Sequence, residues 1–365
     1  MRAALLEAHG TPLVIVDDVE IDQPEAGEVL VRVHYCGLCH SDVSVVTSTT
    51  RSVTPIIVGH EAAGVVEAVG AGVTRVKPGD PVMLTPCPPC GHCYWCLRGE
   101  HSICVNSGAI ASNAFPDGRT RLSRHGATVY RGVGVGAFAE FVLIQEAGAV
   151  PVPADTPLDI ACVIGCAVQT GVGAVLNCAR VEEGATVLVM GLGGIGMSIV
   201  QGARLAGASR IIVSDPVSSR RDAAARFGAT DAIDPTTTDV REEAIRLTGV
   251  GVDYAFDAVG RAALVETGLW ATRNGGTTII VGAAPLEDTL TLTPVLLMLT
   301  EKKLRSTLLG SSNSPFEIPR LLRLWRAGRL DLEGLVTAQR PLSEINAAID
   351  DLEHGRGIRT VLAIA

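Results

Sequence analysis

Three short segments far apart in the chain carry residue types that bind metals. Residues 39–42 read Cys-His-Ser-Asp, residues 59–61 read Gly-His-Glu, and residues 165–166 read Gly-Cys. A single cysteine or histidine is more often a buried structural side chain. Two cysteines with one histidine, however, form one of the recognised ligand sets of a catalytic zinc, which keeps a fourth position open. Together the three segments predict an open metal site.

A run of closely spaced cysteines predicts a second metal site of a different kind. Cys87, Cys90, Cys93 and Cys96 stand three residues apart, and Cys104 follows eight residues later. Four thiolates held this close suit a closed tetrahedral zinc site. Iron–sulfur ligation is the alternative, but the ferredoxin pattern ends on a longer step, which this chain lacks. Five cysteines compete for four positions, and spacing alone does not say which one is left out.

A glycine-rich turn predicts a dinucleotide site. Gly191, Gly193 and Gly196 form G-x-G-x-x-G between a predicted strand, residues 185–190, and a predicted helix. Such a turn brings backbone amides and a helix N-terminus close to a pyrophosphate. Asp215 ends the next predicted strand, where a carboxylate binds ribose hydroxyls and repels a 2′-phosphate, so NAD is expected over NADP. The alternative, a glycine turn in a domain that binds no nucleotide, fits this combination less well.

The elements that must position these residues change in character along the chain. Up to about residue 150, short β-branched segments are broken by glycine and proline, which predicts a β-rich part. From about residue 161, apolar runs alternate with helical stretches, which predicts βαβ units and a doubly wound parallel sheet. The fold class is therefore α/β. The strands expected are residues 28–34, 63–69, 137–142, 185–190, 210–214, 254–259, 277–281 and 360–364, with a late helix at 316–327.

Composition and charge limit the classes of partner. At 365 residues the chain exceeds the length at which one hydrophobic core usually keeps growing, so two domains are expected. With 47% hydrophobic and 19% charged residues it is not a disordered chain. A net charge of −9 argues against binding nucleic acid or an anionic membrane, which leaves a small-molecule partner. The absence of a secretory apolar run, together with clustered cysteines, predicts a cytoplasmic location.

These motifs together resemble the zinc-dependent medium-chain alcohol dehydrogenase family over almost the whole chain. The family's glycine-flanked His-Glu signature corresponds to Gly59-His60-Glu61-Ala62-Ala63-Gly64. Its structural-zinc pattern fits Cys90, Cys93, Cys96 and Cys104, and leaves Cys87 outside. The resemblance implies a GroES-like catalytic domain, residues 1–167 with 310–365, around a Rossmann NAD-binding domain, residues 168–309. It also implies two zinc ions per subunit.

The resemblance further implies roles for individual residues. The catalytic zinc ligands would be Cys39, His60 and Cys166, with Glu61 beside them, Asp42 orienting His60 and Ser41 taking the proton of the alcohol. Residues assigned to the cofactor are the turn Gly191, Gly193, Gly194, Ile195 and Gly196, the ribose acid Asp215, and His40, Thr170, Arg220, Val281 and Arg359. Of these, His40 and Arg359 would face the pyrophosphate, Thr170 and Ile195 the nicotinamide, Arg220 the adenosine, and Val281 the carboxamide.

The implied activity is reversible hydride transfer between a primary or secondary alcohol and NAD. Two alternatives share every motif: a formaldehyde-type dehydrogenase acting on an S-hydroxymethyl thiol adduct, and a nicotinoprotein that keeps its NAD bound. A non-catalytic NAD-binding protein is the alternative from another class. That class is disfavoured because the three candidate ligands and Ser41 are all present.

Three features depart from or vary within the family pattern. Ser44 stands where many members carry a histidine that ends the proton relay, and Pro86 stands at a wall position that is often aromatic. A long insertion, residues 107–136, follows the cysteine run. Members with an insertion here tend to be dimers, so a homodimer is expected.

Overall fold

The computed structural model describes residues 1–49 and 52–364, which divide into two compact units. The first unit comprises Met1–Ala167 and Asn313–Ala365, and the second comprises Val168–Ser312. Both helices and strands are present in each, so the predicted α/β class is confirmed. No single helix in the described ranges is long and apolar enough to cross a membrane, although one bent pair, Leu158–Gly165 with Ala167–Ala179, meets the length and composition test.

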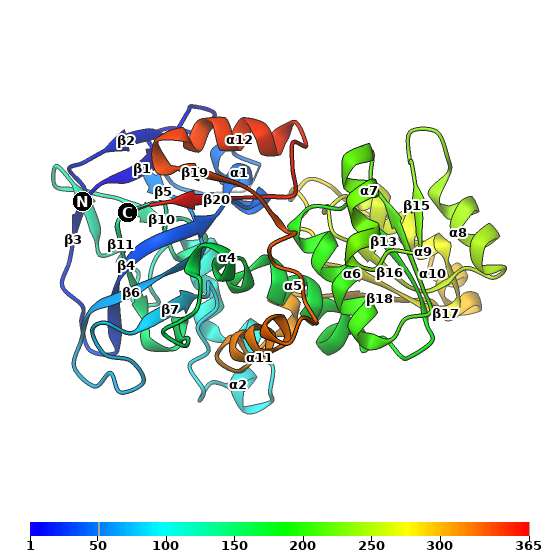
Figure 1. Ribbon diagram of the computed structural model, residues 1–365, viewed down its shortest axis with the longest axis horizontal. Helices are drawn as coiled ribbons and strands as arrows, with labels where there is room; N and C mark the ends of the chain where they lie inside the picture. The colour runs from blue at the N-terminus through cyan, green and yellow to red at the C-terminus, as the bar shows by residue number, and fades with distance from the viewer. Residues whose placement is uncertain (50–51, 365) are drawn as a thin grey trace. The chain divides into compact units, whose positions relative to one another are not determined.

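The first unit is built on a sheet whose strand order is β12-β7-β6-β4-β20-β19, with β11 also paired to β4 (Figure 1). The long strand β4 (Glu28–Gly37) alternates fully buried Val29, Val31 and Val33 with other residues, which sets one face against the core. It runs antiparallel to β6 (Glu61–Val69), with Gly37 opposite Glu61. This pairing brings the end of β4 to the start of β6, where two of the predicted metal-binding segments lie.

The remaining elements of the first unit are short. Its other strands are β1 (Ala3–Leu6), β2 (Val14–Val16), β3 (Glu20–Ile21), β5 (Ile56–Ile57), β7 (Pro81–Leu84), β8 (Leu122–Arg124), β9 (Ala127–Thr128), β10 (Tyr130–Arg131), β11 (Phe141–Gln145), β12 (Ala149–Pro151), β19 (Val336–Pro341) and β20 (Arg359–Ala363). Its α-helices are α1 (His40–Val46), α2 (Tyr94–Leu97), α3 (Ala109–Ser112), α4 (Leu158–Ala161), α11 (Ser314–Arg326) and α12 (Ile345–Glu353). The short helix η5 (Cys162–Gly165) contacts β4, β6 and β7.

The second unit contains the parallel sheet that the alternating pattern predicted. Its six strands have the order β15-β14-β13-β16-β17-β18, and all pairs are parallel (Figure 1). This is the strand order of a Rossmann fold. The strands are β13 (Thr186–Met190), β14 (Arg210–Ser214), β15 (Asp231–Ile233), β16 (Val252–Asp257), β17 (Thr272–Ile280) and β18 (Lys303–Ser306). The helices are α5 (Ala167–Gly173), α6 (Gly194–Ala206), α7 (Ser218–Phe227), α8 (Val240–Thr248), α9 (Ala262–Ala271) and α10 (Pro294–Thr300).

Two local features differ from the sequence expectation. The strand predicted at residues 137–142 begins only at Phe141, because the backbone N–H groups of Ala137 and Phe138 donate to Gly59 and Val58 instead of to β4. The segment is thereby held beside the residues that lead to His60. The second difference is a π-helical turn, Ala174–Ala179, which follows α5 and which no sequence pattern predicted.

Candidate active site

The three metal-binding segments predicted from the sequence meet in the first unit. Cys39 caps α1 just after β4, His60 directly precedes β6, and Cys166 directly follows η5. One donor atom from each lies within 4.8 Å of the others, and all three residues are buried. Two thiols and an imidazole suit zinc, whereas magnesium and calcium prefer oxygen ligands. The three donors therefore fit a zinc site with an open position.

Asp42 fixes the orientation of His60. Its Oδ1 accepts hydrogen bonds from His60 Nδ1 and from the backbone N–H of Gly59, both at 2.9 Å. Its Oδ2 accepts from the backbone N–H of Cys39 at 3.0 Å. Because a carboxylate only accepts, Nδ1 carries the proton and Nε2 is left as the metal donor. One buried carboxylate thus positions two of the three segments.

A buried ion pair between Glu61 and Arg359 lies beside the same site. Glu61 Oε2 lies 3.3 Å from Arg359 Nε, and neither side chain is more than 3% exposed. Glu61 Oε1 accepts from the backbone N–H of Ala167 at 2.7 Å, and Arg359 Nη1 donates to the carbonyl of Leu38 at 2.7 Å. Burial raises the pKa of Glu61 to about 7, although Arg359 opposes the rise. Arg359 is thus a neighbour of Glu61, and its contact with a pyrophosphate stays a prediction.

The two thiols of the site are not equivalent. Cys166 donates a hydrogen bond to Cys39, and this bond, with Arg359 and His60, holds the pKa of Cys39 well below its ordinary value although burial opposes it. The same bond and burial hold the pKa of Cys166 well above its ordinary value. One thiolate is therefore stabilised by the protein itself. A divalent cation would displace the second proton, as metal binding by thiols requires.

The cysteine run forms a separate, partly buried cluster in the first unit. Cys90, Cys93, Cys96 and Cys104 bring their sulfur atoms within 4.8 Å of one another. Backbone N–H groups donate to three of these sulfurs, at 3.3 to 3.5 Å. Donation by the N–H groups of Cys96 and Val105 lowers the pKa of Cys93 to about 6. Four sulfurs with backbone donors fit a closed zinc site.

Cys87 lies outside that cluster. It is 2% exposed, and burial raises its pKa to about 12. Its sulfur is not part of the group formed by Cys90, Cys93, Cys96 and Cys104. The ambiguity that spacing left open is therefore resolved by backbone geometry, which gathers four of the five cysteines.

The serines of α1 lie beside the open metal site. Ser41 Oγ is 3.8 Å from Cys39 Sγ. Ser44 lies three residues further along the same helix, where its carbonyl accepts from the Thr49 side chain. His40 begins the helix and is exposed. The Ser41 hydroxyl thus contacts a candidate ligand, and its role in proton transfer stays a prediction.

The predicted glycine turn joins β13 to α6 in the second unit. A Cβ atom on Gly196 would overlap the carbonyl of Gly191, whereas a Cβ on Gly193 would meet nothing within 4 Å. Gly196 therefore allows the helix to pack against the turn, and Gly193 leaves open space over it. Asp215 directly follows β14 and accepts from the N–H of Leu192 at 2.7 Å and of Val217 at 2.8 Å. Asp215, which the sequence predicts to bind the ribose, is thus hydrogen-bonded to the glycine turn through Leu192.

The other residues assigned to the cofactor are divided between the units. Thr170 lies in α5, Ile195 in α6, Arg220 in α7, and Val281 directly after β17, all in the second unit. His40 and Arg359 belong to the first unit. Their individual contacts with NAD stay predictions.

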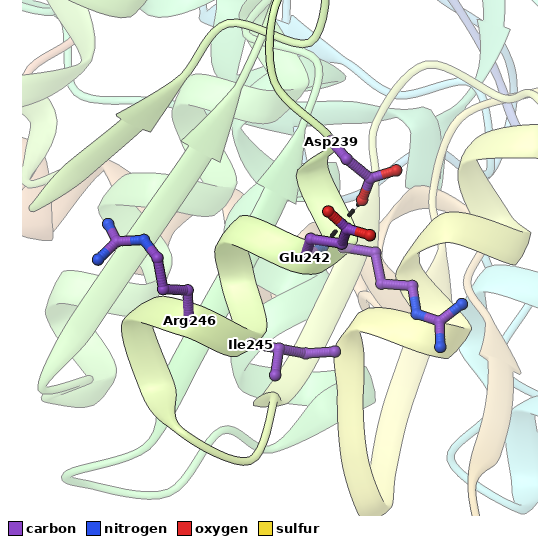
Figure 2. A pocket seen from close by; sticks show the side chains of 5 residues that line it. Asp239, Glu242, Ile245 and Arg246 are labelled. Carbon is purple, nitrogen blue, oxygen red and sulfur yellow. Dashed lines mark hydrogen bonds between the residues drawn. The ribbon is translucent and has the colours of Figure 1, made fainter.

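A surface hollow elsewhere in the second unit contains none of the predicted residues. It lies along α8 and is lined by Asp239, Arg241, Glu242, Ile245 and Arg246 (Figure 2). Asp239 accepts from the N–H of Glu242 and so caps the helix, and Arg246 pairs with Glu243. The charges of Asp239 and Arg246 are thus explained by helix capping and pairing. The hollow is therefore not a candidate active site.

One residue of the site was missed from the sequence. Gly37, at the end of β4, faces Glu61 so closely that a Cβ would lie 2.9 Å from the Glu61 Cδ atom. The available signal was a glycine inside a strand pattern, which often marks close approach of another group.

Comparison with known proteins matches both parts of the chain to family models. The model described as alcohol dehydrogenase GroES-like domain matches residues 25–154, and the model described as zinc-binding dehydrogenase matches residues 194–325. Among curated proteins, the chain is 36% identical to S-(hydroxymethyl)glutathione dehydrogenase of Escherichia coli O139:H28, over 99% of each chain.

Solved structures show the same likeness. An alcohol dehydrogenase zinc-binding domain protein from Burkholderia ambifaria is 37% identical, with a TM-score of 0.94 over 100% of this chain and 98% of that one. Benzyl alcohol dehydrogenase from Acinetobacter calcoaceticus is 31% identical, also with a TM-score of 0.94, over 100% of this chain and 99% of that one. The similarity therefore extends over both units.

Proposed function

The chain belongs to the zinc-dependent medium-chain alcohol dehydrogenase family, and we propose that it oxidises an alcohol to an aldehyde or ketone with NAD as the hydride acceptor. The observation that carries this proposal is the convergence of Cys39, His60 and Cys166 on one buried point, with a separate closed cluster of four cysteines. We assign the first unit to the GroES-like catalytic domain and the second to the Rossmann NAD-binding domain. The first cluster would hold a catalytic zinc and the second a structural zinc.

The chain's own residues supply orientation and a proton path. When bound, a zinc with an open position acts as a Lewis acid that makes an alcohol hydroxyl more acidic. Asp42 holds the proton on His60 Nδ1 and so keeps Nε2 available. Ser41 Oγ, next to the ligand set, would receive the proton that the alcohol loses. Asp215 would accept hydrogen bonds from the ribose through the lone pairs that its two backbone contacts leave free.

The substrate is the finer part of the proposal. We favour a simple primary or secondary alcohol, with an S-hydroxymethyl thiol adduct as the second candidate because a relative at 36% identity is named for that activity. The test is a panel of aliphatic and aromatic alcohols, and of formaldehyde with and without thiols, each assayed with added NAD and with an artificial acceptor alone. NADH formation with the alcohols is expected. Turnover only with a thiol present would select the adduct, and turnover without added NAD would indicate a nicotinoprotein.

Cofactor choice gives a direct test of Asp215. Asp215→Asn keeps an acceptor but removes the negative charge, so the preference for NAD over NADP is expected to fall by about tenfold or more, the scale of a charge-assisted hydrogen bond. The measurement is kcat/KM for each cofactor. Asp222→Asn, on the solvent side of the following helix, is the matched control and should leave the ratio unchanged. Equal use of both cofactors by the unaltered enzyme would refute the assignment.

We further propose that the enzyme is a cytoplasmic homodimer joined through the second unit. The strand β18 is the last in its sheet, and all four of its residues are exposed. The preceding helix α10 exposes Val295, Met298 and Leu299 by 51%, 67% and 68%. An open strand edge beside apolar side chains can pair with the same edge of a second copy. Six of the ten cysteines lie in the two metal-binding groups, which require reduced thiols and so support a reducing location.

A charge placed on that surface should separate the dimer. Met298→Glu would bury a carboxylate in an apolar interface, so the molar mass from light scattering is expected to fall from that of two chains toward that of one. Leu97→Glu, on a residue 76% exposed in the first unit, is the control and should stay dimeric. A dimer that survives Met298→Glu would place the interface elsewhere.

A further inference from the structure

Gly37 occupies a position where backbone conformation does not require glycine. Its φ is outside the left-handed region that other residues avoid. A Cβ there would nevertheless lie 2.9 Å from Glu61 Cδ and closer still to Glu61 Oε2. The Glu61 carboxylate is therefore what excludes a side chain at residue 37. The backbone conformation of β4 would itself allow a side chain there.

The Glu61 carboxylate that fills this space is linked to the segments of all three candidate zinc ligands, directly to two of them and through Arg359 to the third. It follows His60 directly, and its Oε1 accepts from Ala167, the residue after Cys166. Its Oε2 has no hydrogen-bond partner among the described residues, and its charge is met by Arg359 Nε at 3.3 Å. Arg359 in turn donates to the carbonyl of Leu38, the residue before Cys39.

We propose that Gly37 is a positioning residue of the catalytic-zinc site: its missing side chain is the slot that keeps the Glu61 carboxylate between Ala167 and Arg359. The inference rests on the proposed function, because it concerns retention of the zinc bound by Cys39, His60 and Cys166. Displacing Glu61 would leave Arg359 buried without its carboxylate, and would release the loops that carry two of the ligands. Partners of metal ligands typically affect metal affinity by 10–100-fold.

A second glycine on the same pair of strands shows a different requirement. A Cβ on Gly64 would overlap the carbonyl of Arg32, so this glycine is needed for the two strands to pair closely. No change at Glu61 could relieve that contact. Gly64 therefore offers a control that disturbs the sheet without acting through the carboxylate.

The test measures zinc release from the holoenzyme. Gly37→Ala is expected to release one of its two zinc ions about tenfold or more faster to a chromogenic chelator than the unaltered enzyme does. The zinc of the four-cysteine cluster should leave at an unchanged rate and serves as an internal reference. Gly108→Ala, at a position where a Cβ meets nothing within 4 Å, should behave as the unaltered enzyme.

A second substitution separates positioning from general damage. Glu61→Asp shortens the side chain and withdraws the Oε2 atom that an added Cβ would approach most closely. Gly37→Ala should therefore have a smaller effect on zinc release in the Glu61→Asp background than in the unaltered enzyme. Gly64→Ala should show no such dependence on residue 61. If Gly37→Ala alone does not fold, recovery of folded, zinc-loaded enzyme in the Gly37→Ala/Glu61→Asp variant supports the proposal, and failure of both overturns it.

The outcomes distinguish this inference from the proposed function. Two results would show that Gly37 does not act through Glu61. One is that Gly37→Ala speeds zinc release equally with glutamate and with aspartate at residue 61, and the other is that it does not speed zinc release at all. A failure of the unaltered enzyme to hold zinc at Cys39, His60 and Cys166 would instead refute the proposed function. Cobalt substitution, read from its visible absorption, reports whether that site is loaded independently of activity.

Discussion

Cys166→Ala is expected to lower kcat/KM by about 10³-fold or more while the fold is retained, because a Lewis-acid metal supplies several kcal/mol of catalysis. Zinc content should fall from two ions per chain to one, since two of the three donors remain but the set is incomplete. Metal analysis, alcohol oxidation and thermal unfolding together check the result. Removal of the same zinc from the unaltered enzyme by a chelator should have the same effect on activity.

Two other cysteines give matched comparisons. Cys162 is fully buried only four residues earlier and belongs to neither metal-binding group, so Cys162→Ala should keep both zinc ions and most activity. Cys93→Ala should instead lose the other zinc and the stability that a structural site contributes. A single zinc in the unaltered enzyme, or iron with visible absorbance, would contradict the two-site assignment.

The parts of the molecule governed by local pattern could be predicted from the sequence. The parallel sheet was predicted because its strands are apolar runs separated by helices, as burial on both faces requires. Val187, Val189 and Ile212 are indeed fully buried. Residues 137–142 followed a similar local pattern, but only their last two residues lie in a strand, as the start of β11. The backbone N–H of Phe138 donates instead to Val58, a contact that no local pattern predicts.

The site shows the same division. Cysteine spacing indicated a closed metal site but could not exclude Cys87, since that choice depends on which sulfurs the backbone N–H groups reach. The Glu61–Arg359 pair was not predicted, because its partners come from opposite ends of the chain and meet only through the β4–β6 and β4–β20 pairings. The residues that could bind a metal were therefore predictable from the sequence. The contacts that position them were not, because those contacts depend on long-range strand pairing.

Ser41→Ala is expected to lower the rate of alcohol oxidation by about 10²-fold or more, the usual scale of proton-transfer catalysis. The Ser41 hydroxyl lies 3.8 Å from Cys39 Sγ, so it is in direct contact with one of the candidate ligands. Removing it would leave the alcohol proton without a first acceptor. The measurement is kcat over a range of pH, with the zinc content of the variant shown to be unchanged.

Ser44 distinguishes the possible exits for that proton. It lies three residues from Ser41 and so on the same side of α1, but its side chain has no group that titrates near neutral pH. Ser44→Ala should therefore change the rate little, and the proton would reach solvent through the ribose and ordered water or through His40. Ser44→His should speed turnover below about pH 7 if the relay limits the rate, because a histidine can carry the proton there. A Ser44→Ala variant as impaired as Ser41→Ala would show that Ser44 itself carries the proton.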